Sequence, residues 1–336
     1  MALETTQRQR TKVTIDEYVH YHREGYVIKR GLLDQQDVDR LLKWTDDIYE
    51  GKINLDHLTH VASWMTEAQK TERIASARFH QPHRHDATAE WGILHPRVLD
   101  VLEGLIGPDV LALQSMLFFN PPDKGGQGWH QDAYYIQTQP NSLIGVWIAL
   151  DRADEENGCL WVAPGSHHEP IYPPPQRRSG YVHADDRQIE GLFPANAVSV
   201  LDDEVNNLSK IAAKYGKAIP VVLEPGDVLF FHSHLLHRSY VNRTEDRFRR
   251  SYVTHYCNAR SRVPWGFQGK DEDTPHILAR GRTHLPYAKP KFGTPVELTN
   301  LPDSIESNKD MGDMMVATPE GDMGKLHVPE EGHKHN

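Results

Sequence analysis

The chain has 336 residues, of which 38% are hydrophobic, and a formal net charge of -10 at pH 7. This composition suits a globular protein of one or two domains without a membrane partner, because no apolar run approaches the roughly 20 residues of a membrane-spanning helix. The negative charge argues against a nucleic-acid partner, and the presence of only two cysteines, Cys159 and Cys257, argues against a disulfide framework and predicts a cytoplasmic location.

The N-terminal third of the chain shows helical periodicity. The predicted helices are residues 15–23, 34–49 and 96–105. Thr14 is a suitable N-cap for the first helix and Gly25 lies just past its end, before a short predicted strand at 26–29. In the second helix Val38, Leu41, Leu42 and Ile48 share one side, with Trp44 expected at its edge.

From residue 110 onward the pattern changes to short apolar runs separated by turns rich in glycine and proline. The predicted strands are 110–119, 142–150, 159–163, 219–224, 227–231 and 249–256. Helices followed by many short strands indicate an α+β chain built around a sandwich or barrel.

Two segments fall outside this pattern. Residues 167–217 form an insertion between strands, with a helix expected near 203–215, and loops this long are usually functional or disordered. We expect a lid over the pocket, in which Arg177 and Arg178 could attract an acidic substrate; the alternative is a solvated loop. The predicted organisation is a single domain over 1–300 and a mobile tail over 301–336, which lacks periodicity.

A metal site is suggested by the sequence GWHQDAYY at residues 128–135 and by the unusual total of 21 histidines. If these residues form a strand, His130 and Asp132 project from the same face. Two histidines and one carboxylate on one face of an octahedral metal are typical of non-haem iron oxygenases. A second His-x-Asp, His183 to Asp185, lies in the insertion without a strand pattern, and we interpret it as a solvated loop.

The third ligand should come from residues 226–256, which hold several histidines: His232, His234, His237 and His255. His237 is favoured because Arg249 follows it twelve residues later, at the start of a predicted strand. An arginine on an adjacent strand can clamp the distal carboxylate of a dicarboxylate that chelates the iron. The other three histidines are interpreted as ordinary strand residues.

Another histidine-rich segment, HQPHRHD at 80–86, could in principle hold a separate metal through His80, His83, His85 and Asp86. Its spacing suits no common structural zinc motif. We interpret it as a polar loop near the mouth of the pocket.

Five motifs, in order, carry a family resemblance: EYVHYHREGYVIKRGLL, SMLFFNPPD, WHQD, NGCLWVAPGSH and EPGDVLFFHSHLLHRSYVNRTEDRFR. Over about residues 14–260 the chain resembles the phytanoyl-CoA dioxygenase family of iron- and 2-oxoglutarate-dependent oxygenases. The resemblance implies a double-stranded β-helix, or jelly roll, flanked by N-terminal helices. It also implies Fe(II), 2-oxoglutarate and O2 as cofactor and cosubstrates, and a small-molecule substrate that is oxidised with release of succinate and CO2. Substrate identity and oligomeric state stay open.

The resemblance also implies roles for individual residues. His130, Asp132 and His237 match the iron ligands. Arg249 matches the arginine that binds 2-oxoglutarate, with Arg247 and Arg250 as alternatives because the spacing from His237 is one residue longer than usual. Ser239 matches a hydroxyl that assists the same carboxylate. Trp147 and Met116 match positions that line the cosubstrate pocket, although core packing explains them equally well. Beside the ligand motif, Tyr134 or Tyr135 could line the substrate pocket or pack in the core.

The carboxylate at Asp132 bears on the type of reaction. Relatives that halogenate carry a small residue there, so its presence implies hydroxylation or a related oxidation. The competing interpretation is a jelly-roll metal-binding protein without redox chemistry, or a cupin-like isomerase. Neither of these needs Arg249 and Ser239 after His237, so these two residues favour the oxygenase.

Overall fold

The computed structural model describes residues 9–53, 55, 61–76, 79–172, 208–264 and 274–299, and the short pairs 316–317 and 323–324. The chain separates into two units, Met1–Thr299 and Asn300–Asn336. In the second unit, β12 (Val316–Ala317) and β13 (Met323–Gly324) form an antiparallel pair. No helix in the described ranges has the length and apolar character needed to cross a membrane. Both cysteines are buried and free, and the cytoplasmic location stays a prediction.

Among the described residues, five α-helices precede the first long strand: α1 (Ile15–Glu24), α2 (Gln35–Tyr49), α3 (Glu67–Ser76), α4 (Ala87–Ile93) and α5 (Pro96–Ile106). The three predicted helices are confirmed as α1, α2 and α5. Helix α1 begins with a capping box, in which Thr14 and Glu17 each bond the other's backbone N–H, and it ends at Gly25, whose φ of 84° favours glycine. Trp44, predicted at the edge of the apolar side of α2, is buried at 2% exposure and meets Tyr252 edge-on.

The main sheet has the strand order β1-β7-β4-β9-β3-β10-β11, with β2 paired to β3. Its strands are β1 (Tyr26–Lys29), β2 (Phe79–His80), β3 (Val110–Phe118), β4 (Ile144–Ala149), β7 (Val228–His232), β9 (Ser251–Asn258), β10 (Ile277–Gly281) and β11 (Glu297–Leu298). A smaller sheet has the order β6-β5-β8, formed by β6 (Ile219–Val221), β5 (Leu160–Val162) and β8 (His237–Ser239). The predicted α+β jelly-roll class is confirmed.

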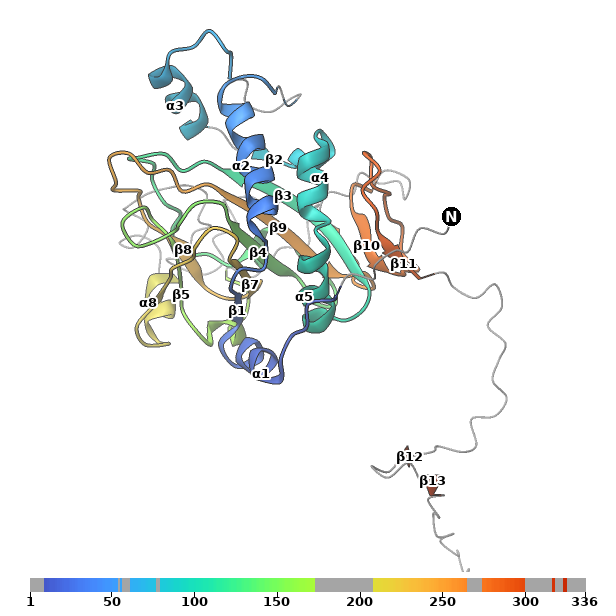
Figure 1. The fold of residues 1–336 in the computed structure, drawn as a ribbon. Coiled ribbons are helices and arrows are strands. Elements are labelled where there is room, and N and C mark those ends of the chain that lie inside the picture. Colours follow the sequence, from blue (N-terminus) through green and yellow to red (C-terminus); the bar gives the residue numbers. More distant parts are fainter. Residues whose placement is uncertain are drawn as a thin grey trace, which may run out of the picture. The chain divides into compact units, whose positions relative to one another are not determined.

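Side chains alternate between the two faces of the main sheet, and both faces are covered by other elements. On β4, Val146 and Ile148 pack with α2, α4 and α5 in one apolar cluster, whereas Trp147 and Ala149 pack with residues of the small sheet in another. Figure 1 shows α2, α4 and α5 lying along one side of the main sheet and the strands β5 and β8 on the other. The interior between the two sheets is therefore the place where a buried site can form.

Several elements differ from the prediction. Strand β8 was not predicted because its residues, His237, Arg238 and Ser239, are polar and show no apolar alternation. The short strands β10 and β11 and the helices α3 and α4 were also missed. Most of the insertion 167–217 lies outside the described residues. Its described end contains α8 (Leu208–Ala213), within the predicted helix at 203–215, and Leu208 packs in a cluster with Trp129.

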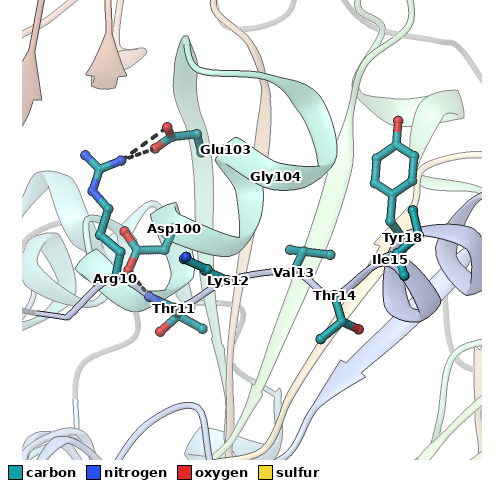
Figure 2. A pocket seen from close by; sticks show the side chains of 10 residues that line it. All are labelled: Arg10, Thr11, Lys12, Val13, Thr14, Ile15, Tyr18, Asp100, Glu103 and Gly104. Atoms are coloured by element: carbon teal, nitrogen blue, oxygen red, sulfur yellow. Dashed lines mark hydrogen bonds and ion pairs between the residues drawn. The ribbon is translucent and has the colours of Figure 1, made fainter. Parts of the chain in front are cut away.

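The residues before α1 lie across α5 and beside a hollow of about 560 Å³ (Figure 2). The Thr11 N–H donates to Asp100 over 2.8 Å, and Arg10 forms an ion pair with Glu103 at 3.0 Å. Asp100 also pairs with the buried Arg280 of β10 at 2.9 Å. These contacts tie the N-terminal residues, α5 and β10 together.

Glu90 of α4 binds residues 291–294, near the end of the first unit, to the layer of helices. Its fully buried carboxylate accepts backbone N–H groups from Lys291, Phe292 and Thr294, and the Thr294 hydroxyl at 2.7 Å. Four donors converge on one carboxylate, so an acceptor is required at this position.

We expect Glu90→Gln to lower the free energy of unfolding by about 1–3 kcal/mol, because the amide turns an NH2 group toward backbone donors and leaves some of them unsatisfied. Urea unfolding measures this change. Glu72→Gln on the exposed side of α3 is the matched control and should change stability by less than about 0.5 kcal/mol. Equal effects of the two substitutions would contradict the role of Glu90.

Candidate metal centre

Three metal-binding side chains meet in the interior. The Nε2 atoms of His130 and His237 lie 3.8 Å and 3.7 Å from Oδ1 of Asp132. One donor atom from each residue lies within 4.8 Å of the others, and all three residues are buried. In the part of the chain that the structure describes, this is the one group of histidine, cysteine or acidic residues that meets so closely.

Backbone pairing brings the ligands together. The N–H of His130 donates to the carbonyl of His237 over 3.0 Å, and the N–H of His237 donates back over 3.2 Å. His237 begins β8, whereas Asp132 begins the short helix α6 (Asp132–Tyr135). The prediction that His130 and Asp132 share one face of a strand is therefore wrong: extended pairing stops at His130, and a helical turn brings the carboxylate beside the imidazoles.

The two imidazoles are held with Nε2 free. Nδ1 of His130 lies 2.8 Å from the carbonyl of Gly128, and Nδ1 of His237 lies 2.9 Å from the carbonyl of Leu235. A carbonyl can only accept, so each Nδ1 carries the proton and each Nε2 presents a lone pair. Burial, together with the neighbouring His237, lowers the pKa of His130 to about 3, which favours the neutral form that binds metals.

Asp132 is held by a residue that was not assigned to the site. Its Oδ2 lies 2.9 Å from Nε2 of His255, on β9. Burial alone raises the pKa of Asp132, but the interactions with His255, His237 and His130 outweigh burial and bring the pKa below its ordinary value. The carboxylate is therefore ionised, as a ligand must be.

His255 was interpreted as an ordinary strand residue, and its place in the site corrects that interpretation. A signal was present in the sequence: on the predicted strand 249–256, His255 shares a face with Arg249, which was assigned to the site.

The donor set fits a divalent metal of the non-haem iron type. Two neutral imidazoles and one ionised carboxylate offer three ligands from one side, which is the two-histidine, one-carboxylate arrangement. The Nδ1 hydrogen bonds to backbone carbonyls orient both rings, as outer partners of metal-bound histidines do.

Arg249 lies buried in the same interior. It is 4% exposed, and its guanidinium carbon lies 5.6 Å from the ring of Trp147. Its Nε has no hydrogen-bond partner, and no described carboxylate forms an ion pair with it. Burial lowers its pKa to about 10. A cation at this depth without a counter-ion is suited to binding an anion.

The alternative arginines are already engaged. Arg247 forms ion pairs with Asp154 and Glu156, both at 2.8 Å. Arg250 forms ion pairs with Asp151 at 2.8 Å and with Asp46 at 2.6 Å. These contacts favour Arg249 as the residue that receives a ligand.

Arg249 was predicted to lie on a strand next to His237, and this is wrong. It comes before β9 in the main sheet, with its N–H bonded to the carbonyl of Asn120 over 3.1 Å, whereas His237 belongs to the small sheet. The metal ligand and the arginine therefore come from different sheets.

The remaining predicted cosubstrate residues lie near this region. Val253 of β9 pairs with Trp147 of β4 and with Met116 of β3, so these three residues form a row across the sheet. All three belong to the interior apolar cluster or pack against it. The Ser239 hydroxyl accepts the N–H of Gln127 over 3.0 Å, which leaves its own proton to donate.

The two tyrosines after the ligand motif differ in exposure. Tyr134 is only 4% exposed, whereas Tyr135 is partly exposed and its ring centre lies 6.2 Å from that of His130. Tyr135 is the better candidate for a substrate contact. Arg177, Arg178 and the His183 to Asp185 segment lie outside the described residues.

The NGCLWVAPGSH motif supports residues next to the site. The Asn157 amide donates to the carbonyls of Arg152 and Phe248, the latter residue preceding Arg249. The Ser166 hydroxyl accepts the N–H of Leu236, which precedes His237, over 2.8 Å. These contacts give the motif a structural role beside the site.

The histidine-rich segment at 80–86 is not a loop, contrary to prediction. It supplies the end of β2, a 3-10 helix at Pro82–Arg84 and the N-cap of α4 at Asp86, which accepts two backbone N–H groups. His83 is 1% exposed and lies 2.6 Å from the Ser115 hydroxyl.

The fold and the buried donor set define a jelly-roll protein with a two-histidine, one-carboxylate centre. The chain belongs to the phytanoyl-CoA dioxygenase (PhyH) family, which matches it over residues 21–251, and this confirms the resemblance seen in the sequence.

Similar curated proteins include the peroxisomal phytanoyl-CoA dioxygenase of Bos taurus, 26% identical over 75% of this chain and 71% of its own length. Phytanoyl-CoA dioxygenase domain-containing protein 1 of Danio rerio is 27% identical over 71% of this chain and 88% of its own length. Similar solved structures include the non-heme monooxygenase ThoJ, with a TM-score of 0.56 and 20% identity over 82% of this chain and 88% of that one. The α-ketoglutarate-dependent carbocyclase SnoK has a TM-score of 0.55 and 17% identity over 78% and 92%. At these identities the structural likeness establishes the fold.

Gly145 has no side chain, and this leaves space for the ring of Phe231 beside the ligand His237. A Cβ atom at Gly145 would lie 2.3 Å from the ring of Phe231, and that ring lies 4.8 Å from the ring of His237. We expect Gly145→Ala to lower the free energy of unfolding by about 1–3 kcal/mol through overpacking. Adding Phe231→Leu should recover part of this loss in urea unfolding. Simple addition of the two single effects would contradict the proposed contact.

Proposed function

We propose that the protein is an Fe(II)- and 2-oxoglutarate-dependent dioxygenase that hydroxylates or otherwise oxidises a small-molecule substrate and releases succinate and CO2. The observation that carries the proposal is Arg249, a buried guanidinium without an anionic partner among the described residues, in the same interior as a buried His-Asp-His group. Family membership supports an oxidoreductase. The similar structures support the cofactors, since one is CytC3 with Fe(II) and α-ketoglutarate.

In this proposal His130 and His237 hold Fe(II) through Nε2, and Asp132 holds it through Oδ1. Iron and 2-oxoglutarate, when bound, supply the activation of O2 and the oxidising power. Arg249 binds the distal carboxylate of 2-oxoglutarate through a planar, charge-assisted pair.

Other side chains shape the site. Trp147 and Met116 form apolar walls that exclude water from the cosubstrate, and Ser239 donates its hydroxyl proton to the same distal carboxylate. Tyr135 contacts the substrate beside His130. The insertion 167–217, with Arg177 and Arg178, remains proposed as a lid for an acidic substrate.

The alternative is a jelly-roll metal-binding protein without redox chemistry, or a cupin-like isomerase. Such a protein needs the metal ligands but has no use for an unpaired buried arginine, and a buried unpaired charge is costly. The deciding assay is succinate formation from 2-oxoglutarate under air, with Fe(II) and ascorbate, across a substrate library. Mass spectrometry of the converted substrate then detects the gain of one oxygen atom.

We expect His130→Ala, Asp132→Ala and His237→Ala each to abolish substrate-dependent succinate formation while circular dichroism shows a retained fold. Removal of metal by a chelator should have the same effect, and Fe(II), unlike Zn(II), should restore turnover. His234→Ala is the matched control, because His234 lies in the same segment but bonds the carbonyl of Glu169 instead. Full turnover by His237→Ala would disprove the assignment of the third ligand.

Arg249→Ala should weaken 2-oxoglutarate binding by ~2–5 kcal/mol, the usual cost of removing one partner of a buried charge pair. Arg249→Lys should recover only part of the affinity, because lysine lacks the planar fork. Isothermal titration of the metal-loaded protein measures both effects. Arg247→Ala and Arg250→Ala serve as controls and should reduce stability without changing 2-oxoglutarate affinity. A larger loss of affinity in either control would overturn the role of Arg249.

A further inference from the structure

The two oxygens of the Asp132 carboxylate have different partners. Oδ1 faces Nε2 of His130 and of His237, at 3.8 Å and 3.7 Å. Oδ2 lies 2.9 Å from Nε2 of His255. His255 is 3% exposed and Asp132 is 8% exposed, so solvent does not compete strongly for this bond.

The hydrogen bond fixes the proton of His255. An ionised carboxylate can only accept, so Nε2 of His255 donates. Nδ1 of His255 is buried and has no hydrogen-bond partner within the described ranges. The single hydrogen bond found for this ring is therefore the one to the carboxylate of Asp132.

The strand register holds the ring in place. His255 lies on β9 between Gln114 of β3 and Gly145 of β4. β9 is a central strand that is paired with a neighbour on each side, so the backbone of His255 is held from both sides. Asp132, by contrast, lies in the four-residue helix α6.

We propose that His255 is a positioning residue of the metal centre, which holds Asp132 so that Oδ1 alone is presented to the metal. This inference rests on the proposed metal site. The terminal torsion of an aspartate is broad, so an unrestrained carboxylate can turn or offer both oxygens to a metal. A hydrogen bond from a rigid strand to Oδ2 removes that freedom, as outer partners of metal ligands do.

A purely structural role accounts poorly for a histidine here. A buried polar atom without a partner is costly, and Nδ1 of His255 is such an atom. An apolar side chain would fill the same space without this cost. A packing role therefore predicts that replacing His255 changes stability alone, whereas a positioning role predicts that it weakens metal binding as well.

The test is anaerobic titration of the metal-free full-length protein with Co(II), followed by its visible absorption, together with urea unfolding of the same metal-free proteins. His255→Phe retains a ring without the donor, and His255→Leu replaces it should the phenylalanine variant not fold. His255→Gln places an amide N–H near the position of Nε2 and is the conservative variant.

The matched control is His83→Phe. His83 is also buried and bonds a neighbouring side chain, the Ser115 hydroxyl. Ser115 precedes Met116 on β3, so it lies on the opposite face of the main sheet from the interior site.

We expect His255→Phe to weaken Co(II) binding about 10- to 100-fold, the usual effect of losing an outer partner, in addition to any loss of metal-free stability. His255→Gln should bind within a few-fold of the wild type, and His83→Phe should lose stability but keep its Co(II) affinity. Wild-type affinity in both His255→Phe and His255→Leu would overturn the role of His255 alone. Failure of the wild type to bind Co(II) would overturn the metal centre and this inference together.

Discussion

The reciprocal backbone hydrogen bonds between His130 and His237 are the interaction on which the site depends. They join a segment that follows the first long strand to a strand of the small sheet, and so bring two imidazoles from distant parts of the chain to ring centres 4.1 Å apart. The helical turn that begins at Asp132 then needs to place only one carboxylate. A bridge made of backbone atoms leaves both side chains free for a ligand, which a bridge between side chains would not.

The burial of two charged side chains, Asp132 and Arg249, explains the rest of the arrangement of the site. Histidines surround the Asp132 carboxylate, whereas Arg249 lies over the ring of Trp147, a member of the apolar cluster, without a counter-ion among the described residues. Burying an unpaired guanidinium lowers stability, and an anion that binds it recovers that loss. In the proposed function, the distal carboxylate of the cosubstrate is the anion that binds Arg249.

The sequence predicted what local signals determine. Helix α1 carries both halves of a capping box and a glycine at its end, so its bounds were found almost to the residue. Strand β8 was missed because His237 to Ser239 form a strand through pairing with distant residues, which no local pattern records. The choice among Arg247, Arg249 and Arg250 could not be made from spacing, since the three carry the same charge and differ only in what lies opposite.

The attachment of residues 277–298 defines where the folded unit ends. The family match stops at residue 251, yet β10 covers the edge of β3 and supplies Arg280 to the buried Asp100. A chain that ended at Asn258, just after β9, would expose the edge of β3 at Val110–Ala112 and remove the cation from that carboxylate. An exposed edge of this kind invites pairing with another copy, so the shortened protein should be prone to aggregate even though every proposed iron and 2-oxoglutarate residue is still present.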